Sequence, residues 1–280
     1  MKNIFYIILT FILATVLVSC QPIEKRDGMG DVVASADQIQ ATATQVIDNG
    51  VKTNRIMLHC SSKVLSQWYD GVRTLCSSDT AINLFLTGSQ NLTLTTRSAD
   101  GTQFTKTFTF SVDATTYYVA PQYGYFCGSG SRTWIWAGDN KYTLNDAGLS
   151  RIWGNGGRTD VLPTWWGRYT ADAVDDNIDL AGEMTFTLQG LQFSKVESGQ
   201  TTTGSFSFDM NTHSTANGIG QITFKKTTIL HGIGQNDNKV VVYVFDIAKL
   251  TNDEMILMYP TASNTYENWF WVFKRQGFTY

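Results

Sequence analysis

Apolar and polar residues alternate in short runs along most of the chain, and this pattern predicts β-strands. In KTFTFSV, at residues 106–112, phenylalanine and valine take every second position and threonine and serine lie between them. The same alternation recurs at residues 91–97, 183–188 and 204–210. A period of two residues places the apolar side chains on one face of a strand, which is typical of a half-buried sheet.

Clusters of glycine, asparagine, aspartate and serine separate the alternating runs. They include SADG at residues 98–101, GNGG at residues 154–157 and GQNDNK at residues 234–239, and such clusters indicate turns. Short strands punctuated in this way are typical of β-sandwiches and β-barrels, so we expect an all-β fold. Helical periodicity is weak throughout, and residues 35–48 are the one segment that we expect to form a helix.

The distribution of tryptophan divides the chain into two units that meet near residues 113–122. Trp68 precedes this boundary, and the remaining tryptophans of the eight in the chain follow it. We therefore expect one domain at residues 38–115 and a larger, tryptophan-rich domain at residues 116–280. The uneven distribution of tryptophan favours a spacer domain followed by a functional domain.

The beginning of the chain has the pattern of a secretory signal peptide. Lys2 precedes an almost unbroken apolar run at residues 4–18, which ends in the sequence LVSC. A positive residue followed by such a run is typical of a signal peptide, and the run is too short for a membrane-spanning helix. The ending resembles a bacterial lipobox, which implies that residues 1–19 are removed and that Cys20 carries a lipid anchor. Residues 20–37, polar at first with proline and glycine, are expected to form a flexible tether.

Composition and charge narrow the classes of partner. Charged residues make up 16% of the chain and its net charge is −3, against a usual charged share of about 25%. This leaves no basic field that could hold nucleic acid, so we expect no nucleic-acid partner. Aromatic residues reach 13% of the chain, and with abundant threonine, serine, glycine and asparagine this composition is typical of a β-rich extracytoplasmic binding protein.

Three cysteines remain after Cys20, namely Cys60, Cys76 and Cys127. Because three is an odd number, at least one thiol stays free or pairs outside the chain. A disulfide between Cys60 and Cys76 and buried free thiols are both open alternatives. The spacing of cysteine and histidine does not indicate a zinc site.

Three segments of the first unit, in order, resemble a PKD-type immunoglobulin-like domain. They are NRIMLHCSS at residues 54–62, SQWYDGVRT at residues 66–74 and the hairpin of residues 86–112, which turns at an Asp-Gly pair. An Asp-Gly pair supplies the positive φ of a tight hairpin. The resemblance implies a β-sandwich that acts as a spacer, with Trp68 as its core tryptophan.

Several motifs of the second unit resemble a domain that follows PKD-like units in surface lipoproteins of bacterial polysaccharide-utilisation systems. The matching residues are Gly128, Arg132, Thr133, Trp134, Trp136, Pro163, Trp165, Trp166, Asp175, Asp176, Phe186 and the closing run that ends in Phe-Lys-Arg. The resemblance implies an outer-membrane lipoprotein that faces outward and binds polysaccharide or oligosaccharide without catalysis. We expect a jelly-roll β-sandwich similar to a carbohydrate-binding module. The alternative is a lipocalin-like barrel, because the last hairpin also resembles that of lipocalin-like lipoproteins.

Two adjacent tryptophans, Trp165 and Trp166, are the leading candidates for contact with a sugar. Neighbouring residues of an extended chain point to opposite faces, so we expect one ring in the core and the other offered to ligand. An aromatic ring matches the apolar face of a pyranose, and polar side chains match its hydroxyl rim. Trp153 lies in a similar Gly- and Arg-rich segment, where loops present functional groups. The other candidate ligand-binding residues are Arg158, Arg168 and Tyr169.

The remaining tryptophans have the spacing of strand residues that share one face. Trp134 and Trp136 are two residues apart, as are Trp269 and Trp271. Period-two spacing favours packing in a core. We expect one of these two pairs to pack in the core.

The alternatives to glycan binding are a glycoside hydrolase, a lipocalin-like binder of small ligands and an assembly partner of an outer-membrane glycan transporter. Glycoside hydrolysis needs two carboxyl groups that flank the scissile bond. The acidic run at residues 172–183, DAVDDNIDLAGE, has the pattern of a solvated loop or of a structural calcium site. The chain also lacks the Gly-x-Ser-x-Gly and His-Glu-x-x-His motifs. We therefore expect no enzyme, no catalytic residues and no cofactor apart from that calcium alternative.

Overall fold

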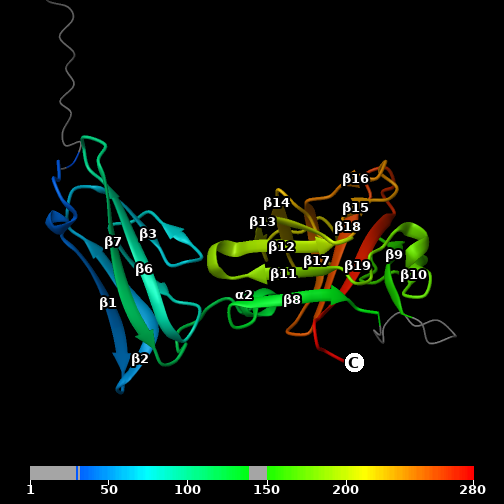
Figure 1. Cartoon of the computed structure of the whole chain (residues 1–280), viewed down its shortest axis with the longest axis horizontal. Helices are drawn as coiled ribbons and strands as arrows, with labels where there is room; N and C mark the ends of the chain where they lie inside the picture. Colours follow the sequence, from blue (N-terminus) through cyan, green and yellow to red (C-terminus); the bar gives the residue numbers. More distant parts are fainter. Residues whose placement is uncertain (1–29, 31, 139–149) are drawn as a thin grey trace, which may run out of the picture.

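The computed structural model describes residue 30, residues 32–138 and residues 150–280, and it shows an all-β protein of two domains. Figure 1 shows the domains end to end along the long axis of the molecule. The predicted signal peptide, Cys20 and most of the predicted tether lie outside the described residues. Within the described ranges, no helix is both long and apolar enough to cross a membrane.

The described part of the N-terminal domain is built from two antiparallel sheets that face each other. One sheet has the order β1-β2-β5 and the other has the order β4-β3-β6-β7. The strands are β1 (Ala41–Asp48), β2 (Val51–Cys60), β3 (Leu65–Tyr69), β4 (Thr74–Leu75), β5 (Asp79–Asn83), β6 (Gly88–Arg97) and β7 (Gln103–Val112). Alternate residues of the strands meet between the sheets and form one core.

The core of this domain is centred on Trp68, as the sequence predicted. Its side chain is fully buried, and its ring centroid lies 5.7 Å from that of Phe108. The indole Nε1 donates a hydrogen bond to the carbonyl oxygen of Ser77 at 3.0 Å. The hairpin of β6 and β7 turns at Gly101, which has the positive φ of 89° that such a turn requires.

The prediction of a helix at residues 35–48 is wrong. The structure has only a short 3₁₀ turn there, η1 (Ala36–Gln38), and then strand β1. Strand β1 pairs with β2 from Ala41 opposite Cys60 to Asp48 opposite Val51. Its alternating Ala-Thr-Ala-Thr sequence suits a strand, and the pairing with β2 outweighs the weak helical propensity of the segment.

The C-terminal domain is a closed antiparallel barrel of eight strands within the described residues. The strands are β8 (Ser131–Trp136), β11 (Glu183–Thr187), β12 (Gln192–Glu197), β13 (Gln200–Asp209), β14 (Gln221–Lys225), β17 (Val244–Leu250), β18 (Glu254–Pro260) and β19 (Glu267–Arg275). Strands β11 to β19 follow one another around the barrel, and β8 closes it by pairing with both β11 and β19. This up-and-down closure differs from the expected jelly-roll, which consists of two packed sheets.

The barrel interior is filled by aromatic side chains. Phe186 lies within ring-contact distance of Phe193, Phe206 and Phe224, with centroids 4.9, 5.0 and 6.0 Å away. Trp271 continues the series, since its ring centroid lies 5.2 Å from that of Phe245. Inward positions of small barrels are commonly filled in this way. The interior is therefore a packed core.

One end of the barrel, the proximal end, carries the contact with the N-terminal domain. Helix α2 (Pro121–Cys127) covers this end and buries Phe126 and Cys127. Phe85 of the N-terminal domain packs edge-on against Tyr123, with centroids 4.5 Å apart. The turn η3 (Gln189–Leu191) adds a backbone hydrogen bond from Gly190 N to Gly71 O at 2.6 Å. The two domains thus share an apolar and hydrogen-bonded contact.

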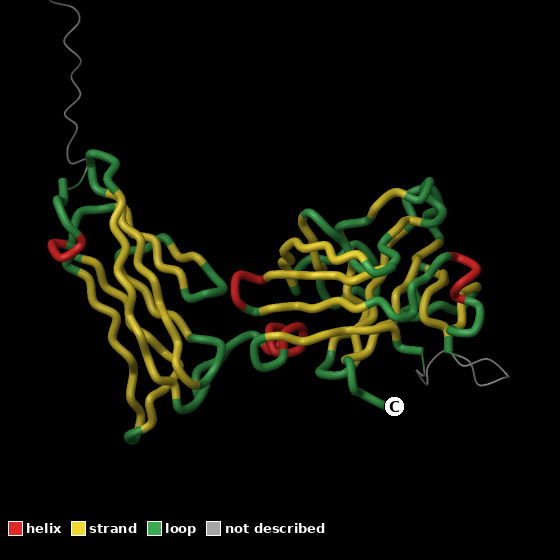
Figure 2. The backbone as a smooth tube through the Cα atoms, viewed as in Figure 1, coloured by secondary structure: helices red, strands yellow, loops and turns green. Residues whose placement is uncertain are grey.

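The opposite end of the barrel, the distal end, carries most of the remaining elements. They are β9 (Arg151–Gly157), β10 (Trp166–Tyr169), η2 (Ala173–Asp176), β15 (Ile233–Gly234) and β16 (Val240–Val241). Strand β19 is long enough to pair with β8 through Phe273–Arg275 and with β9 through Glu267–Trp271. Strands β9 and β10 therefore extend the sheet beyond the barrel. Figure 2 shows loops and a helical turn gathered at this end.

Candidate functional site

Three tryptophan rings and one histidine ring form a cluster at the distal end of the barrel. Trp153 and Trp269 are buried, with ring centroids 4.7 Å apart. Trp166 packs edge-on against both, at 5.7 Å from Trp153 and 5.8 Å from Trp269. His231 contacts the other side of the cluster, 4.6 Å from Trp153. The cluster thus provides a rigid base beneath Trp166.

The side chains of Trp165 and Trp166 are the exposed part of this region, and we call them the tryptophan surface. Their exposed fractions are 54% and 40%, whereas Trp153 is fully buried. The sequence predicted that one of the adjacent pair would anchor in the core, but neither does so. Trp153 and Trp269 take the anchoring role instead. Trp153 was predicted to contact ligand, and the structure places it beneath the surface rather than on it.

Glycines of β9 allow β10 to approach closely. Gly154 lies opposite Gly167 in the ladder between the two strands. A Cβ atom on Gly154 would lie only 2.2 Å from the carbonyl oxygen of Trp166. A Cβ atom on Gly157 would lie 3.4 Å from Cζ2 of Trp165, so the indole of Trp165 lies across this glycine. The GNGG sequence, which was interpreted as a turn, is therefore a strand that supports both exposed tryptophans.

Hydrogen bonds fix the loop that carries the tryptophan surface. The backbone N–H groups of Thr164 and Trp165 both donate to the carbonyl oxygen of Asn155 at 3.1 Å. The Asn155 side-chain oxygen accepts from the N–H of Trp166, also at 3.1 Å. The Asp160 carboxylate accepts from the hydroxyl of Thr164 and from a backbone N–H of β9. The position of both indoles is thus set before any ligand arrives.

Arg168 lies beside Trp166 and is held by the acidic run that follows it. Its guanidinium lies 5.0 Å from the centre of the Trp166 ring and hydrogen-bonds the carboxylate of Asp176. It also lies 3.8 Å from Asp172 and 3.6 Å from Asp175. The carboxylates of the acidic run thus balance the positive charge of Arg168. Across the described ranges, no group of three or more His, Cys, Asp or Glu side chains is arranged to hold a metal ion.

The other two predicted polar residues brace the loops. Arg158 donates from Nη2 to the carbonyl oxygens of Thr261 at 2.7 Å and of Asn264 at 3.1 Å. The hydroxyl of Tyr169 accepts from Nε of Arg151 at 3.0 Å. Both side chains are therefore close to Trp165 and Trp166 in sequence, but they hydrogen-bond other parts of the protein.

A buried carboxylate, Glu267, joins strand β9 to two loops beneath the surface. It is 3% exposed and accepts hydrogen bonds from Asn155 at 2.5 Å, from Asn236 at 2.9 Å and from the Thr261 hydroxyl at 2.8 Å. The sequence did not indicate this role, because two of its partners, Asn155 and Asn236, are far from it along the chain. Its full set of hydrogen bonds makes it a structural group.

A second carboxylate, Asp237, fastens the loop between β18 and β19. Burial opposes its ionisation, but hydrogen bonds from Ser263, from the backbone of Ala262 and from the hydroxyl of Tyr259 outweigh that effect. They lower the pKa of Asp237 to about 2. The carboxylate is therefore charged at neutral pH and holds the loop in place.

A polar groove of about 460 Å³ lies at the same end of the barrel, and we call it the distal groove. Its lining residues are Asn177, Lys195, Glu197, Ser198, Lys226, Thr227, Thr228, His231, Gly232, Ile233, Val241 and Tyr243. The carbonyl oxygen of His231 accepts from Nε1 of Trp271 at 2.9 Å. Burial lowers the pKa of the His231 imidazole, so this ring is neutral at neutral pH.

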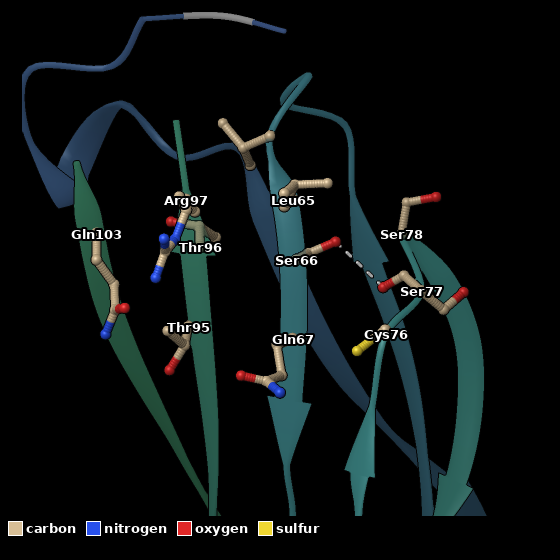
Figure 3. A pocket seen from close by; sticks show the side chains of 11 residues that line it. Leu65, Ser66, Gln67, Cys76, Ser77, Ser78, Thr95, Thr96, Arg97 and Gln103 are labelled. Carbon is tan, nitrogen blue, oxygen red and sulfur yellow. Dashed lines mark hydrogen bonds between the residues drawn. The ribbon is translucent and has the colours of Figure 1, made fainter. Parts of the chain in front are cut away.

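A second hollow, of about 510 Å³, lies in the N-terminal domain (Figure 3). Figure 3 shows the side chains of Gln67, Thr95, Arg97 and Gln103 along three neighbouring strands. The hollow has no aromatic ring in its lining. It therefore offers hydrogen bonds to a ligand but no stacking surface of the kind that suits a pyranose.

The three described cysteines are free thiols. Cys60 and Cys127 are buried, whereas Cys76 is exposed in the hollow of the N-terminal domain. Burial raises the pKa of Cys127 to about 12, so its thiol is protonated and unreactive at neutral pH. Of the two alternatives for Cys60 and Cys76, the structure has the free thiols.

Comparisons with known proteins do not assign the chain. No protein-family model matches it, and no curated protein matches it. The functional argument therefore depends on the geometry of the distal end and on the sequence motifs.

Proposed function

We propose that this protein binds polysaccharide or oligosaccharide, without catalysis, at the tryptophan surface. One observation carries the proposal. Trp165 and Trp166 are adjacent, 54% and 40% exposed, and fixed on a braced loop. An exposed indole offers a flat apolar face that matches the C–H face of a pyranose.

The energetics favour a ligand on this surface. Burial stabilises by about 25 cal/mol for each Å² of apolar surface removed from water. Two adjacent exposed indoles offer a ligand a large apolar surface to bury. A ligand that covers the rings recovers this energy. Because the rings are already fixed by Asn155, Trp153 and Trp269, binding loses little side-chain entropy.

The acidic residues near the surface support binding rather than hydrolysis. Asp172, Asp175 and Asp176 face Arg168, and Glu267 lies buried beneath the loops with its hydrogen bonds satisfied. Hydrolysis needs two carboxyl groups on either side of a bound sugar. The carboxylates here have other partners, so a glycoside hydrolase remains the weaker alternative. A lipocalin-like binder is also weaker, because aromatic rings fill the barrel interior.

The cellular setting of the proposal depends on the sequence motifs. The lipobox-like LVSC favours a lipid anchor at Cys20 on an outer membrane, and the resemblance to polysaccharide-utilisation lipoproteins favours an outward-facing position. The N-terminal domain would then be a PKD-like spacer. In Figure 1 the described chain begins at the far end of the long axis from β9 and β10. This arrangement suits a spacer that holds a binding surface away from a membrane.

The alternative role of the tryptophan surface is contact with an outer-membrane glycan transporter. Exposed aromatic patches also mark protein interfaces. Tyr266, 78% exposed, stands next in the chain to Glu267, whose strand pairs with β9. Polysaccharide binding by the isolated protein separates the two uses, because an assembly surface alone would not retain a glycan.

Native gel electrophoresis in gels that contain polysaccharide tests the proposal. The chain from residue 21 onward, which keeps both domains, should be retarded by at least one member of a broad panel. Trp165→Ala and Trp166→Ala should each remove the retardation. Tyr118→Ala is the matched control, since Tyr118 is 77% exposed in the segment between the domains. Absence of retardation by every polysaccharide, or equal retardation of all variants, would overturn the proposal.

A further inference from the structure

The distal groove lies directly beside the tryptophan surface. His231, which lines the groove, contacts Trp153, and Trp153 in turn supports Trp166. The short turn η2 separates the two areas, because Asp176 at its end binds Arg168 next to Trp166, while the following residue, Asn177, lines the groove. The tryptophan surface and the distal groove are therefore separated by one short turn, and one extended ligand could contact both.

The acidic group of the groove is already neutralised. Lys195 Nζ lies 2.7 Å from a carboxylate oxygen of Glu197 and also donates to the carbonyl oxygen of Ile229 at 3.2 Å. The second carboxylate oxygen of Glu197 accepts the backbone N–H of His231 at 2.6 Å. These bonds fix the wall of the groove, and they leave Glu197 with little capacity to attract a cation.

Other polar groups of the groove have no partner among the described residues. Four polar groups make no hydrogen bond or ion pair within the described ranges. They are the side-chain amide of Asn177, the hydroxyls of Ser198 and Tyr243, and the ammonium of Lys226. Their residues line one groove. Since Lys195 pairs with Glu197, Lys226 is the cation of the lining that has no ion-pair partner among the described residues. Tyr243 is 41% exposed and adds an aromatic ring.

The backbone holds Lys226 in a costly conformation. Lys226 has a φ of 73°. His231, with a φ of 48°, lies in the turn closed by the hydrogen bond from Gly232 N to Ile229 O at 3.2 Å. Asn177, with a φ of 58°, caps η2. Ser198 also has a positive φ, but it belongs to the tight hairpin turn with Gly199, where such values are usual. Left-handed conformations of long side chains are uncommon outside such turns, and they concentrate at functional sites.

From these features we propose that the distal groove binds a sugar residue that carries a carboxylate. The carboxylate pairs with Lys226, the ring stacks on Tyr243, and the hydroxyls bond Asn177 and Ser198. Carboxylate, ring and hydroxyls together match the charge, the aromatic face and the free polar groups of the groove. The choice of a sugar rests on the proposed function, and the polysaccharide would then be an acidic one.

Nuclear magnetic resonance of the histidine side chains tests this site directly, because the chain has three histidines. The probes are sodium glucuronate, glucose and sodium acetate, added to the chain from residue 21 onward. His59→Gln and His213→Gln identify the remaining imidazole signal as that of His231. Glucuronate should shift the His231 signal with a dissociation constant of about 1 mM. Glucose and acetate should each bind about tenfold more weakly, because each lacks part of the contact set.

Two variants of Lys226 and one matched control complete the test. Lys226→Gln removes the charge, and Lys226→Asn does so with a residue that tolerates the left-handed conformation. Either should weaken glucuronate binding about tenfold, whereas Lys225→Gln, on the exposed neighbour in β14, should not. The inference is overturned if glucuronate leaves the His231 signal unmoved, if glucose binds as tightly as glucuronate, or if Lys225→Gln has the same effect as the Lys226 variants.

The two proposals fail separately. Trp166→Ala should remove the retardation in polysaccharide gels and leave the glucuronate shift of His231 intact. If no polysaccharide retards the protein but glucuronate still shifts His231, the groove is a site for an acidic sugar and the proposed function is wrong. If retardation depends on Trp166 and glucuronate has no effect on His231, the proposed function stands and the groove inference is wrong.

Discussion

The ring of Trp153 packs edge-on against the ring of Trp166, with centroids 5.7 Å apart and planes at 79°. One ring is fully buried and the other is 40% exposed. The buried ring also contacts Trp269 and His231. The exposed ring is therefore positioned by the buried one, and the two should respond differently to substitution.

Trp153→Ala should lower the free energy of unfolding by about 3–5 kcal/mol, the usual cost of removing a buried tryptophan side chain. Trp153→Phe should cost much less, because it keeps an aromatic ring. It also deletes an indole N–H that has no hydrogen-bond partner among the described residues, and an unsatisfied buried donor is destabilising. Urea denaturation of both variants measures the difference. Equal losses for the two would contradict this account of the cluster.

Gly154→Ala should separate β10 from β9. The new Cβ would lie 2.2 Å from the carbonyl oxygen of Trp166, so the backbone must move, at a cost of about 1–3 kcal/mol. Polysaccharide binding should fall with it, because Trp165 and Trp166 lose their support. Gly124→Ala is the matched control, since a Cβ there meets nothing within 4 Å and alanine favours helix α2. Thermal denaturation and gel retardation of both variants check the prediction.

Local patterns sufficed to predict several strands of this protein, although not β1 or β9. The alternation in residues 106–112 corresponds to β7, and the alternation in residues 183–188 corresponds to β11. The spacing predicted that one tryptophan pair of the second domain would pack in the core, and both pairs, at 134 and 136 and at 269 and 271, are buried. Period-two patterning is a local property, so it can be recognised without knowing which strands pair.

The closure of the barrel could not be predicted in this way. It depends on β8 pairing with β19, where Trp136 lies opposite Phe273, and no local pattern links positions so far apart in the sequence. The same limit applies to the site. Trp153 was expected to be exposed because of its glycine neighbours, yet those glycines allow β10 to cover it. Glu267 was missed because two of its partners, Asn155 in β9 and Asn236, are far from it along the chain.

Arg168 should couple the acidic run to the tryptophan surface. Arg168→Gln removes the positive charge that lies among Asp172, Asp175 and Asp176, and it removes the cation above the Trp166 ring. We expect a loss of about 1 kcal/mol in the free energy of unfolding, since exposed pairs contribute little individually but several act together here. Polysaccharide binding should weaken because Trp166 becomes less constrained.

Arg168→Lys is the informative companion of that variant. Lysine keeps the charge but cannot contact several carboxylates with a planar group, so we expect only partial recovery of stability and of gel retardation. Added salt should reduce the difference between the wild-type protein and Arg168→Gln, because screening weakens the ion pairs. Full recovery by lysine would show that charge alone matters at this position.

The buried His231 should make the stability of the protein depend on pH. Burial lowers the pKa of its imidazole in the folded protein, with smaller contributions of the same sign from Lys239 and Lys195, whereas Glu197 and Asp176 oppose the change. The unfolded chain therefore takes up a proton first as the pH falls. The free energy of unfolding should decrease as the pH falls from the ordinary histidine pKa, about 6.5, through the lower pKa of the folded state.

His231→Asn isolates this contribution, because asparagine tolerates the left-handed backbone conformation at φ 48° and does not titrate. The variant should be less stable than the wild-type protein at pH 7, since it loses the ring contact with Trp153. The difference should shrink as the pH falls below about 6.5, where the wild-type protein loses stability and the variant lacks this loss. His59→Gln, on an exposed histidine paired with Asp79, should not remove the same pH dependence. Denaturation curves at a series of pH values measure all three proteins, and a constant difference between wild type and His231→Asn would contradict a neutral, buried imidazole at this position.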